Sequence, residues 1–309
     1  MRNDPQIGYN TPLYILPFDH RSSFETGLYG WSGVLSAEQT ERIAKTKEII
    51  YDGFKYALAT GLAKDRAGIL VDEQFGANIL RDASANGFIT AMPAEKSGET
   101  EFQFEFGAHY GAHIEQFKPT FVKVLVRYNA EDDAAMNRRQ AARLKELGDY
   151  CHSHNFYFMF ELLVPATHAQ MDIVEGDQHL YDSNLRPSLM VTALKQLQNA
   201  GVEPDVWKIE GLDRREDCLK IADVARRDGR EQVGCIILGR NSNEQKVVEW
   251  LRAAAGVPGF IGFAVGRTSF WEPLVAWRDG KIGRQQAAET IARKYLEWVK
   301  VFDGAAMSS

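Results

Sequence analysis

The chain has 309 residues, of which 45% are hydrophobic and 25% charged, as expected for a folded protein with a well-filled core. Its formal net charge of -6 offers no positive field for nucleic acid or an anionic membrane, so a small soluble molecule is the expected partner. The sequence has no apolar run long enough to span a bilayer, no cleavable leader and only three, widely spaced cysteines. We therefore expect a cytoplasmic protein with reduced thiols.

Short apolar runs alternate with longer amphipathic segments along the whole chain. The short runs predict eight strands, at residues 13–18, 68–72, 87–92, 121–126, 156–164, 205–209, 234–238 and 260–265. Helical patterns occur at residues 37–61, 131–153, 187–200, 213–229, 243–255 and 285–301. Apolar strands separated by helices are typical of a covered parallel sheet, and eight such units predict an α/β protein with the architecture of a (β/α)8 TIM barrel.

No change in composition and no long linker divides the chain, so we expect a single domain over residues 1–309 with its core at about 13–302. A doubly wound sheet is the structural alternative, but no Gly-x-Gly-x-x-Gly motif follows a predicted strand. Residues 165–186 are rich in His, Asp and Gln and are predicted to form a long loop after the fifth strand. Long loops at this place in a barrel are often lids.

Polar side chains gather at one end of the predicted strands. Such barrels build their active sites at the carboxyl ends of the strands and in the loops that follow. Every strand brings a charged or titratable side chain to this rim, among them Asp19, His20, Arg21, Glu95, Lys123, Glu161, Lys208, Arg240 and Arg267. Several of them interrupt apolar runs, where solubility alone does not explain their presence.

Lys208 stands in the middle of the sixth predicted strand, in the run DVWKIEGL. Burying a charged amine is costly, and an amine that loses its proton on burial becomes a nucleophile. Because side chains alternate along a strand, Lys208 shares a face with Val206, while Trp207 and Ile209 take the other. The bulky apolar pair suits the helix layer, so we expect the lysine to point into the barrel.

The same alternation turns Lys123 and Glu161 into the barrel, so two lysines and a carboxylate are expected to meet there. A carboxylate between two amines can hold one as ammonium and exchange protons with adducts of the other. The alternative is a structural ion pair in which Glu161 or Glu210 neutralises Lys208.

The run DVWKIEG resembles the sixth-strand segment of Schiff-base-forming class I aldolases of the tagatose-bisphosphate and sulfofructose-phosphate aldolase group. The runs LPFDHRSSF and FAVGRTSFWEPLVAW resemble more closely the aldolase-like domain of unknown function that is fused to the sugar kinase of myo-inositol catabolism, 5-dehydro-2-deoxygluconokinase. The likeness covers about residues 13–302. It departs from the aldolases at Arg240, where their loop is less cationic, and at PAEKSG after the third strand.

By this resemblance Lys208 matches the imine-forming lysine, Glu161 the acid/base of the fifth strand and Lys123 the lysine beside the substrate. Asp19 matches the carboxylate of the first strand, and Arg267 the arginine that binds phosphate. An iminium ion supplies the electron sink that cleavage of a carbon–carbon bond requires, so the resemblance implies an aldolase without a metal or other cofactor.

The resemblance also implies a phosphorylated sugar as the small-molecule partner. If the relation to inositol catabolism holds, the substrate is 2-deoxy-5-keto-gluconate 6-phosphate, which is split into dihydroxyacetone phosphate and malonate semialdehyde. The loops after strands seven and eight, with Gly239, Arg240, Gly266 and Arg267, lie where barrels commonly bind phosphate. Arg21 or Arg240 is a candidate for binding the carboxylate of such a substrate.

Other functions remain open at this stage. The chain could be a non-catalytic sugar-phosphate binding or regulatory module, an aldolase for tagatose bisphosphate or sulfofructose phosphate, or a lysine-dependent isomerase or decarboxylase. His109 and His113 have i, i+4 spacing but no HExxH pattern, and are predicted to be surface or packing residues rather than metal ligands. The aromatic C-terminal helix at 285–302 is a candidate contact surface for a homo-oligomer.

Overall fold

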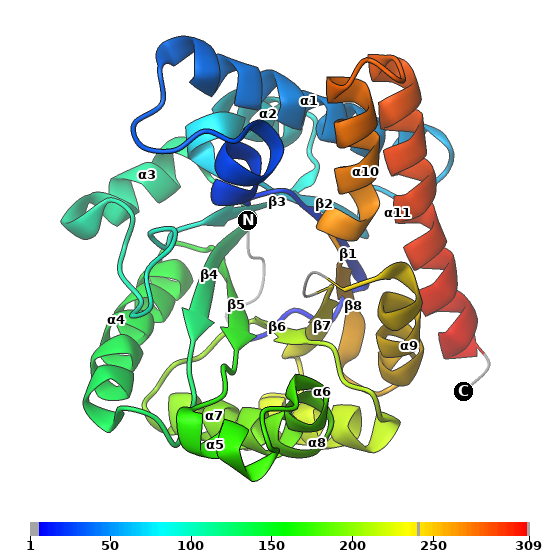
Figure 1. Cartoon of the computed structure of the whole chain (residues 1–309). Helices are drawn as coiled ribbons and strands as arrows, with labels where there is room; N and C mark the ends of the chain where they lie inside the picture. Colours follow the sequence, from blue (N-terminus) through cyan, green and yellow to red (C-terminus); the bar gives the residue numbers. More distant parts are fainter. Residues whose placement is uncertain (1–5, 240–241, 308–309) are drawn as a thin grey trace.

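The computed structural model describes residues 6–239 and 242–307. Eight parallel strands in this part of the chain pair in sequence order, and the last pairs with the first to close a barrel (Figure 1). The strands are β1 (Leu13–Pro17), β2 (Ala67–Leu70), β3 (Ile89–Pro93), β4 (Phe121–Arg127), β5 (Tyr157–Leu163), β6 (Val206–Glu210), β7 (Gly234–Leu238) and β8 (Phe260–Ala264). The (β/α)8 TIM barrel predicted from the sequence is therefore confirmed.

Helices form a ring around the barrel (Figure 1). The longer ones are α1 (Ala37–Ala59), α2 (Glu73–Ala85), α3 (Tyr110–Phe117), α4 (Ala134–Ser153), α7 (Arg186–Asn199), α8 (Arg215–Ala225), α9 (Glu244–Ala254), α10 (Arg267–Arg278) and α11 (Arg284–Met307). Short helical turns are η1 (Ser23–Leu28), η2 (Gly107–His109), α5 (His168–Ile173), α6 (Gln178–Leu180) and η3 (Tyr181–Leu185). Within these described residues, no helix is both long and apolar enough to cross a lipid bilayer.

Two apolar clusters divide the core as strand alternation predicts. The smaller cluster fills the barrel and includes Met159 and Val206. The larger cluster lies between the strands and the helices and includes Trp207 and Ile209. Lys208 therefore belongs to the inward set of β6, and this orientation is confirmed.

The C-terminal helix α11 packs within the chain, against α1, α9 and α10. Its apolar side is buried there, including Trp298 and Phe302. The indole Nε1 of Trp298 also donates a hydrogen bond to Oγ of Ser269 at 2.9 Å. The aromatic side chains that suggested an oligomer contact thus already have partners in the same chain, and association into an oligomer stays a prediction.

Candidate active site

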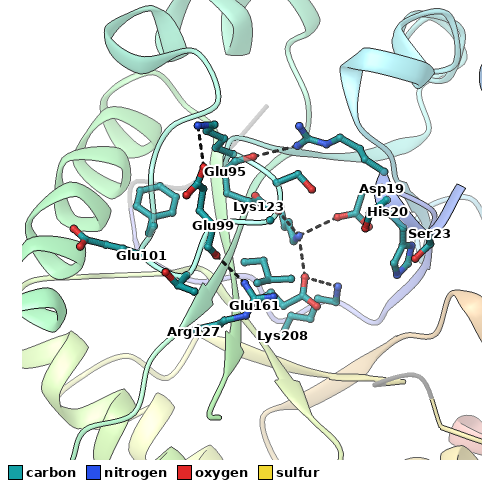
Figure 2. Close-up of a pocket in the computed structure, with 18 residues that line it drawn as sticks. Asp19, His20, Ser23, Glu95, Glu99, Glu101, Lys123, Arg127, Glu161 and Lys208 are labelled. Carbon is teal, nitrogen blue, oxygen red and sulfur yellow. Dashed lines mark hydrogen bonds and ion pairs between the residues drawn. The ribbon is translucent and has the colours of Figure 1, made fainter. Parts of the chain in front are cut away.

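Lys123 is the centre of a charged cluster at the carboxyl ends of the strands (Figure 2). Its Nζ contacts Oδ2 of Asp19 at 2.9 Å, Oε1 of Glu95 at 2.7 Å and Oε2 of Glu161 at 2.9 Å. The lysine side chain is only 1% exposed. Burial lowers the pKa of this amine, but the three carboxylates outweigh burial and hold the pKa well above its usual range. Lys123 is therefore a fixed positive charge beneath the site.

Lys208 lies on the other side of the Glu161 carboxylate (Figure 2). The pairing of β5 with β6 sets Glu161 directly beside Lys208, and Nζ of the lysine is 2.8 Å from Oε2 of Glu161. The other candidate partner, Glu210, accepts a hydrogen bond from the Val164 amide and lies 3.7 Å from Nη1 of Arg186. The ion pair with Glu161 is thus present, and the amine also lines an open cavity.

The three carboxyl groups around Lys123 differ in the direction of their pKa shifts. Burial raises the pKa of Glu161, but Lys123 and Lys208 outweigh it, so the pKa is lowered overall. For Asp19 the same balance of burial against these two lysines also lowers the pKa. At Glu95 burial is stronger than the attraction of Lys123, and the pKa is raised. Glu95 therefore keeps a proton to higher pH than its two neighbours do.

The cavity in front of these groups has a volume of about 240 Å³, large enough for a small organic molecule. One side is formed by the barrel residues Asp19, Lys123, Glu161 and Lys208. The other side is formed by the segment 94–106 between β3 and η2, which contributes residues 95–102. The site is thus a barrel mouth covered by one chain segment.

Long-range hydrogen bonds hold the 94–106 segment over the cavity. Glu95 forms an isolated antiparallel bridge with Phe104, and the amide of Glu105 donates to the carbonyl of Ala94 at 3.0 Å. From α4, Oε1 of Gln140 accepts a hydrogen bond from the Phe102 amide at 2.8 Å. From the loop after β1, Arg21 donates to the Glu95 carbonyl at 3.1 Å. The position of Glu95 is therefore set by several elements rather than by β3 alone.

His20 lines the same cavity between Asp19 and α10. Its ring lies 6.1 Å from the ring of Phe270 in an edge-on arrangement. Nδ1 of His20 is buried and makes no hydrogen bond within the described residues. Burial lowers the pKa of His20 to about 4, with Arg267 and Lys208 acting in the same direction against Asp19. The imidazole is therefore neutral at physiological pH and presents one unused nitrogen.

Arg267, the predicted phosphate ligand, begins α10 and lines a second cavity of about 510 Å³. Ser23 lines both cavities, so the two adjoin. The guanidinium of Arg267 has no ion pair or hydrogen bond to any side chain among residues 6–239 and 242–307, and a pair with Glu272 is not formed there. Burial alone lowers its pKa. This arginine is thus a partly buried cation that faces open space.

The glycines predicted beside phosphate have structural roles. A Cβ on Gly266 would lie 2.3 Å from the carbonyl oxygen of Pro17, so this glycine lets the end of β8 pack against the end of β1. Gly239 follows β7, and its carbonyl accepts a hydrogen bond from the Ser242 amide at 3.1 Å. Arg240 lies outside the described residues.

Other predicted side chains have partners inside the protein. Nη1 of Arg21 pairs with Oε2 of Glu105 at 2.5 Å, so this arginine both borders the cavity and ties down the covering segment. Nδ1 of His113 lies 2.8 Å from Oε1 of Glu73, and the His113 ring stacks on Phe106. The expectation that His113 is a packing residue is confirmed.

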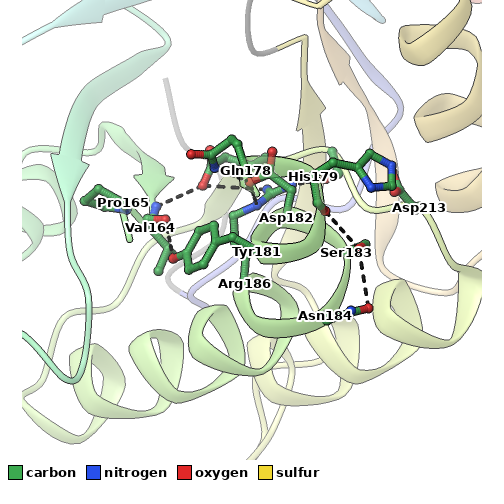
Figure 3. Close-up of polar contacts among 12 residues, drawn as sticks. Val164, Pro165, Gln178, His179, Tyr181, Asp182, Ser183, Asn184, Arg186 and Asp213 are labelled. Carbon is green, nitrogen blue, oxygen red and sulfur yellow. Dashed lines mark hydrogen bonds and ion pairs between the residues drawn. The ribbon is translucent and has the colours of Figure 1, made fainter. Parts of the chain in front are cut away.

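The prediction that residues 165–186 form a long loop is wrong. This segment forms α5, α6 and η3 and leads directly into α7 (Figure 3). The hydroxyl of the buried Tyr181 donates to the Val164 carbonyl at 2.9 Å, and Nε of Arg186 donates to Oδ1 of Asp182 at 3.1 Å. None of its residues is among those that line the cavity containing Lys208. The segment that covers the cavity is 94–106, which contributes residues 95–102 to its lining. This segment is anchored to both α4 and the loop after β1.

Fold and site together define a (β/α)8 barrel with an inward lysine, a neighbouring ammonium and carboxyl groups at its mouth. The chain belongs to the family described as uncharacterized protein conserved in bacteria (DUF2090), whose model matches residues 6–306. No curated protein sequence matches the chain significantly.

Solved structures show the same fold at low sequence identity. Cgl0159 from Corynebacterium glutamicum is 17% identical, with a TM-score of 0.56, over 96% of this chain and 90% of that one. The fructose-bisphosphate aldolase from Slackia heliotrinireducens is 11% identical, with a TM-score of 0.54, over 92% of this chain and 86% of that one. A Schiff-base-forming fructose-1,6-bisphosphate aldolase is 13% identical, with a TM-score of 0.50, over 91% and 93% of the two chains.

Proposed function

We propose that this protein is a class I aldolase that cleaves a phosphorylated keto sugar or keto sugar acid through an imine on Lys208. The observation that carries the proposal is the placement of one buried lysine beside a single carboxylate, Glu161, and in front of an open cavity. A purely structural ion pair has no need of such a cavity. The solved aldolase structures have the same fold and are consistent with the proposal. Many other activities use this fold, so the argument for an aldolase comes from the site residues.

The chemistry begins at the Lys208 amine. Transfer of its proton to Glu161, 2.8 Å away, frees the lone pair for attack on the substrate ketone. Loss of water then gives an iminium ion. After Glu161 has returned to its carboxylate form, it removes the proton from the substrate hydroxyl whose carbon becomes the aldehyde. The carbon–carbon bond breaks and its electron pair moves into the iminium, which becomes an enamine.

Lys123 and Asp19 have supporting roles in this proposal. The fixed ammonium of Lys123 keeps Glu161 in its carboxylate form, which is the form that can accept a proton. The ionised carboxylate of Asp19 lines the cavity and can accept hydrogen bonds from substrate hydroxyls. Arg267 in the adjoining cavity is the candidate anchor for the phosphate, because a partly buried guanidinium with no side-chain partner in the described part of the chain suits an anion.

For the substrate itself we propose 2-deoxy-5-keto-gluconate 6-phosphate, with dihydroxyacetone phosphate and malonate semialdehyde as products, as the sequence resemblance implies. Arg21 is already paired with Glu105, which leaves Arg240 as the other candidate for the substrate carboxylate. Tagatose bisphosphate and sulfofructose phosphate are the alternative substrates, and they require no carboxylate site.

Borohydride reduction in the presence of dihydroxyacetone phosphate tests the proposal. Reduction fixes the imine, so the treated protein should lose its aldolase activity, whereas borohydride or dihydroxyacetone phosphate alone should not inactivate it. EDTA should leave the activity unchanged, because the iminium ion is the electron sink. A binding module would instead hold the phosphate after Lys208→Ala and form no adduct. Products that include no aldehyde would indicate an isomerase or decarboxylase.

A further inference from the structure

Glu95 is the one carboxyl group of the Lys123 cluster that the steps above do not use. Its Oε1 is 2.7 Å from Nζ of Lys123. Its Oε2 is buried and has no hydrogen-bond partner within residues 6–239 and 242–307. The side chain also lines the cavity that contains Lys208. A buried carboxyl oxygen without a hydrogen bond lowers the stability of a protein by about 1–3 kcal/mol. A structural role as third partner of Lys123 accounts for Oε1 of Glu95 but not for Oε2.

The reaction proposed above needs a proton donor after the carbon–carbon bond breaks. Glu161 takes a proton from the substrate hydroxyl, and the enamine left on Lys208 must then gain a proton at carbon before water can release the product. Glu161 holds the hydroxyl proton at this point and is one candidate donor. Glu95 lines the same cavity and contacts the same ammonium, so it is a second candidate, and the exchange measurements below distinguish the two.

We propose that Glu95 is the catalytic acid that protonates the enamine carbon, and that Lys123 carries the proton taken up by Glu161 back to Glu95. The inference rests on the proposed function. Its geometric basis is the bridge formed by Lys123, whose single nitrogen lies 2.7 Å from Glu95 and 2.9 Å from Glu161. Burial raises the pKa of Glu95, so this carboxyl group holds a proton more readily than Asp19 or Glu161 does.

The protons balance over one cycle. The hydroxyl proton moves to Glu161 as the carbon–carbon bond breaks, and the proton of Glu95 moves to the enamine carbon, whose electron pair forms the new C–H bond and restores the iminium. Lys123 passes one of its protons to the Glu95 carboxylate while it accepts the proton held by Glu161, so it remains an ammonium throughout. Water hydrolyses the iminium, which frees the product ketone and returns Lys208 to its ammonium form. No other reactant is consumed.

The 94–106 segment explains how a residue outside the strands reaches this place. The Arg21 guanidinium holds the Glu95 carbonyl, and the bridge to Phe104 fixes the backbone on the other side. The Ala94 amide donates to the carbonyl of Lys123 at 2.9 Å, which ties the start of the segment to β4. Glu95 is thus held rigidly enough to act at a defined atom.

Hydrogen–deuterium exchange tests the role without the aldehyde. In the reverse direction the imine of dihydroxyacetone phosphate loses a hydroxymethyl hydrogen to the Glu95 carboxylate, so the wild-type protein in D2O should replace this hydrogen with deuterium, as followed by proton NMR. Glu95→Gln should slow the exchange at least about 100-fold, the usual worth of a general acid or base. Borohydride should still trap the imine on Lys208 of this variant.

Two further variants separate the roles. Glu161→Gln should form the imine more slowly, because Glu161 accepts the Lys208 proton. Compared at equal amounts of borohydride-trapped imine, its exchange should stay within about tenfold of wild type while cleavage is lost, because Glu161 acts on the hydroxyl and not on carbon. Glu41→Gln is the control, since this exposed carboxylate pairs with Lys45 on α1 and lines neither cavity, and it should change neither readout.

The outcomes are distinguishable. Exchange by Glu95→Gln within threefold of wild type would overturn the assignment of Glu95 as the acid. Loss of both exchange and trapping would show that Glu95 only positions the lysines, and would also overturn it. A wild-type protein that forms no adduct with dihydroxyacetone phosphate would instead contradict the proposed aldolase function itself.

Discussion

Replacing Lys123 by Met removes the ammonium that lies among three carboxyl groups, and its effect on stability should depend on pH. The three contacts are 2.7–2.9 Å long, and the carboxyl side chains are at most 11% exposed. Removing one partner of a buried ion pair costs about 3–5 kcal/mol because the other charge stays buried and unpaired. We expect a loss in this range at pH 8.

The direction of the pH effect follows from burial. Without the ammonium, burial should raise the pKa values of the Asp19 and Glu161 carboxyls above their unfolded values, and each pKa unit corresponds to about 1.4 kcal/mol. A group with a raised pKa contributes stability below its unfolded pKa and loses it as pH rises through the folded pKa. The destabilisation by Lys123→Met should therefore be smaller at pH 5 than at pH 8.

Urea unfolding of wild type and variant at the two pH values measures this difference. Lys47→Met is the matched control, because Lys47 is equally buried but its ion pair among the described residues is with Asp72, so it leaves one carboxyl group rather than three without a cation. A destabilisation by Lys123→Met that is the same at both pH values, or below about 1 kcal/mol, would refute the view of Lys123 as the cation that holds Asp19 and Glu161 ionised.

Three more outcomes follow from the site. Glu161→Gln should lower the cleavage rate about 100- to 10,000-fold, as single-turnover measurement of aldehyde release would show, while imine trapping becomes slower but still occurs on Lys208. Arg267→Met should raise KM for a phosphorylated substrate about tenfold or more with a smaller change in kcat, since a charge-assisted hydrogen bond is worth about 1.5–3 kcal/mol; an unchanged KM would remove Arg267 from the phosphate site. Burial lowers the pKa of His20 from 6.5 to about 4, so this histidine favours folding above its unfolded pKa and loses that effect as pH falls through the folded value. Thermal unfolding should therefore show that wild type loses more stability between neutral pH and pH 4 than His20→Asn does, by up to about 3 kcal/mol, and equal losses would contradict the buried, neutral imidazole.

Strand alternation carried most of the structural prediction. Lys208 comes two residues after Val206 in the run DVWKIEGL. Because side chains alternate along a strand, this spacing places the amine on the same inward face as Val206. The same rule placed Lys123 and Glu161, and the parallel order of the strands then brought the three groups together. These are local properties of the sequence that the barrel preserves.

The parts of the site that were missed depend on long-range contacts. Glu95 was recognised as a polar residue near the end of the third strand. Its approach to Lys123, however, depends on the hydrogen bonds that the 94–106 segment forms with Arg21 and Gln140. The sequence of that segment has no periodic pattern from which these contacts could be predicted. Residues 165–186 were predicted to be a loop but contain helical turns. Turns of three to six residues are too short to show a helical period in the sequence.

Peptide mapping by mass spectrometry after borohydride reduction with dihydroxyacetone phosphate tests the central claim most directly. The account predicts one covalently attached three-carbon phosphate per chain, on the peptide that contains Lys208, and none in Lys208→Ala. An adduct that appears on Lys123 instead, or a wild-type protein that carries no adduct at saturating ligand, would contradict it.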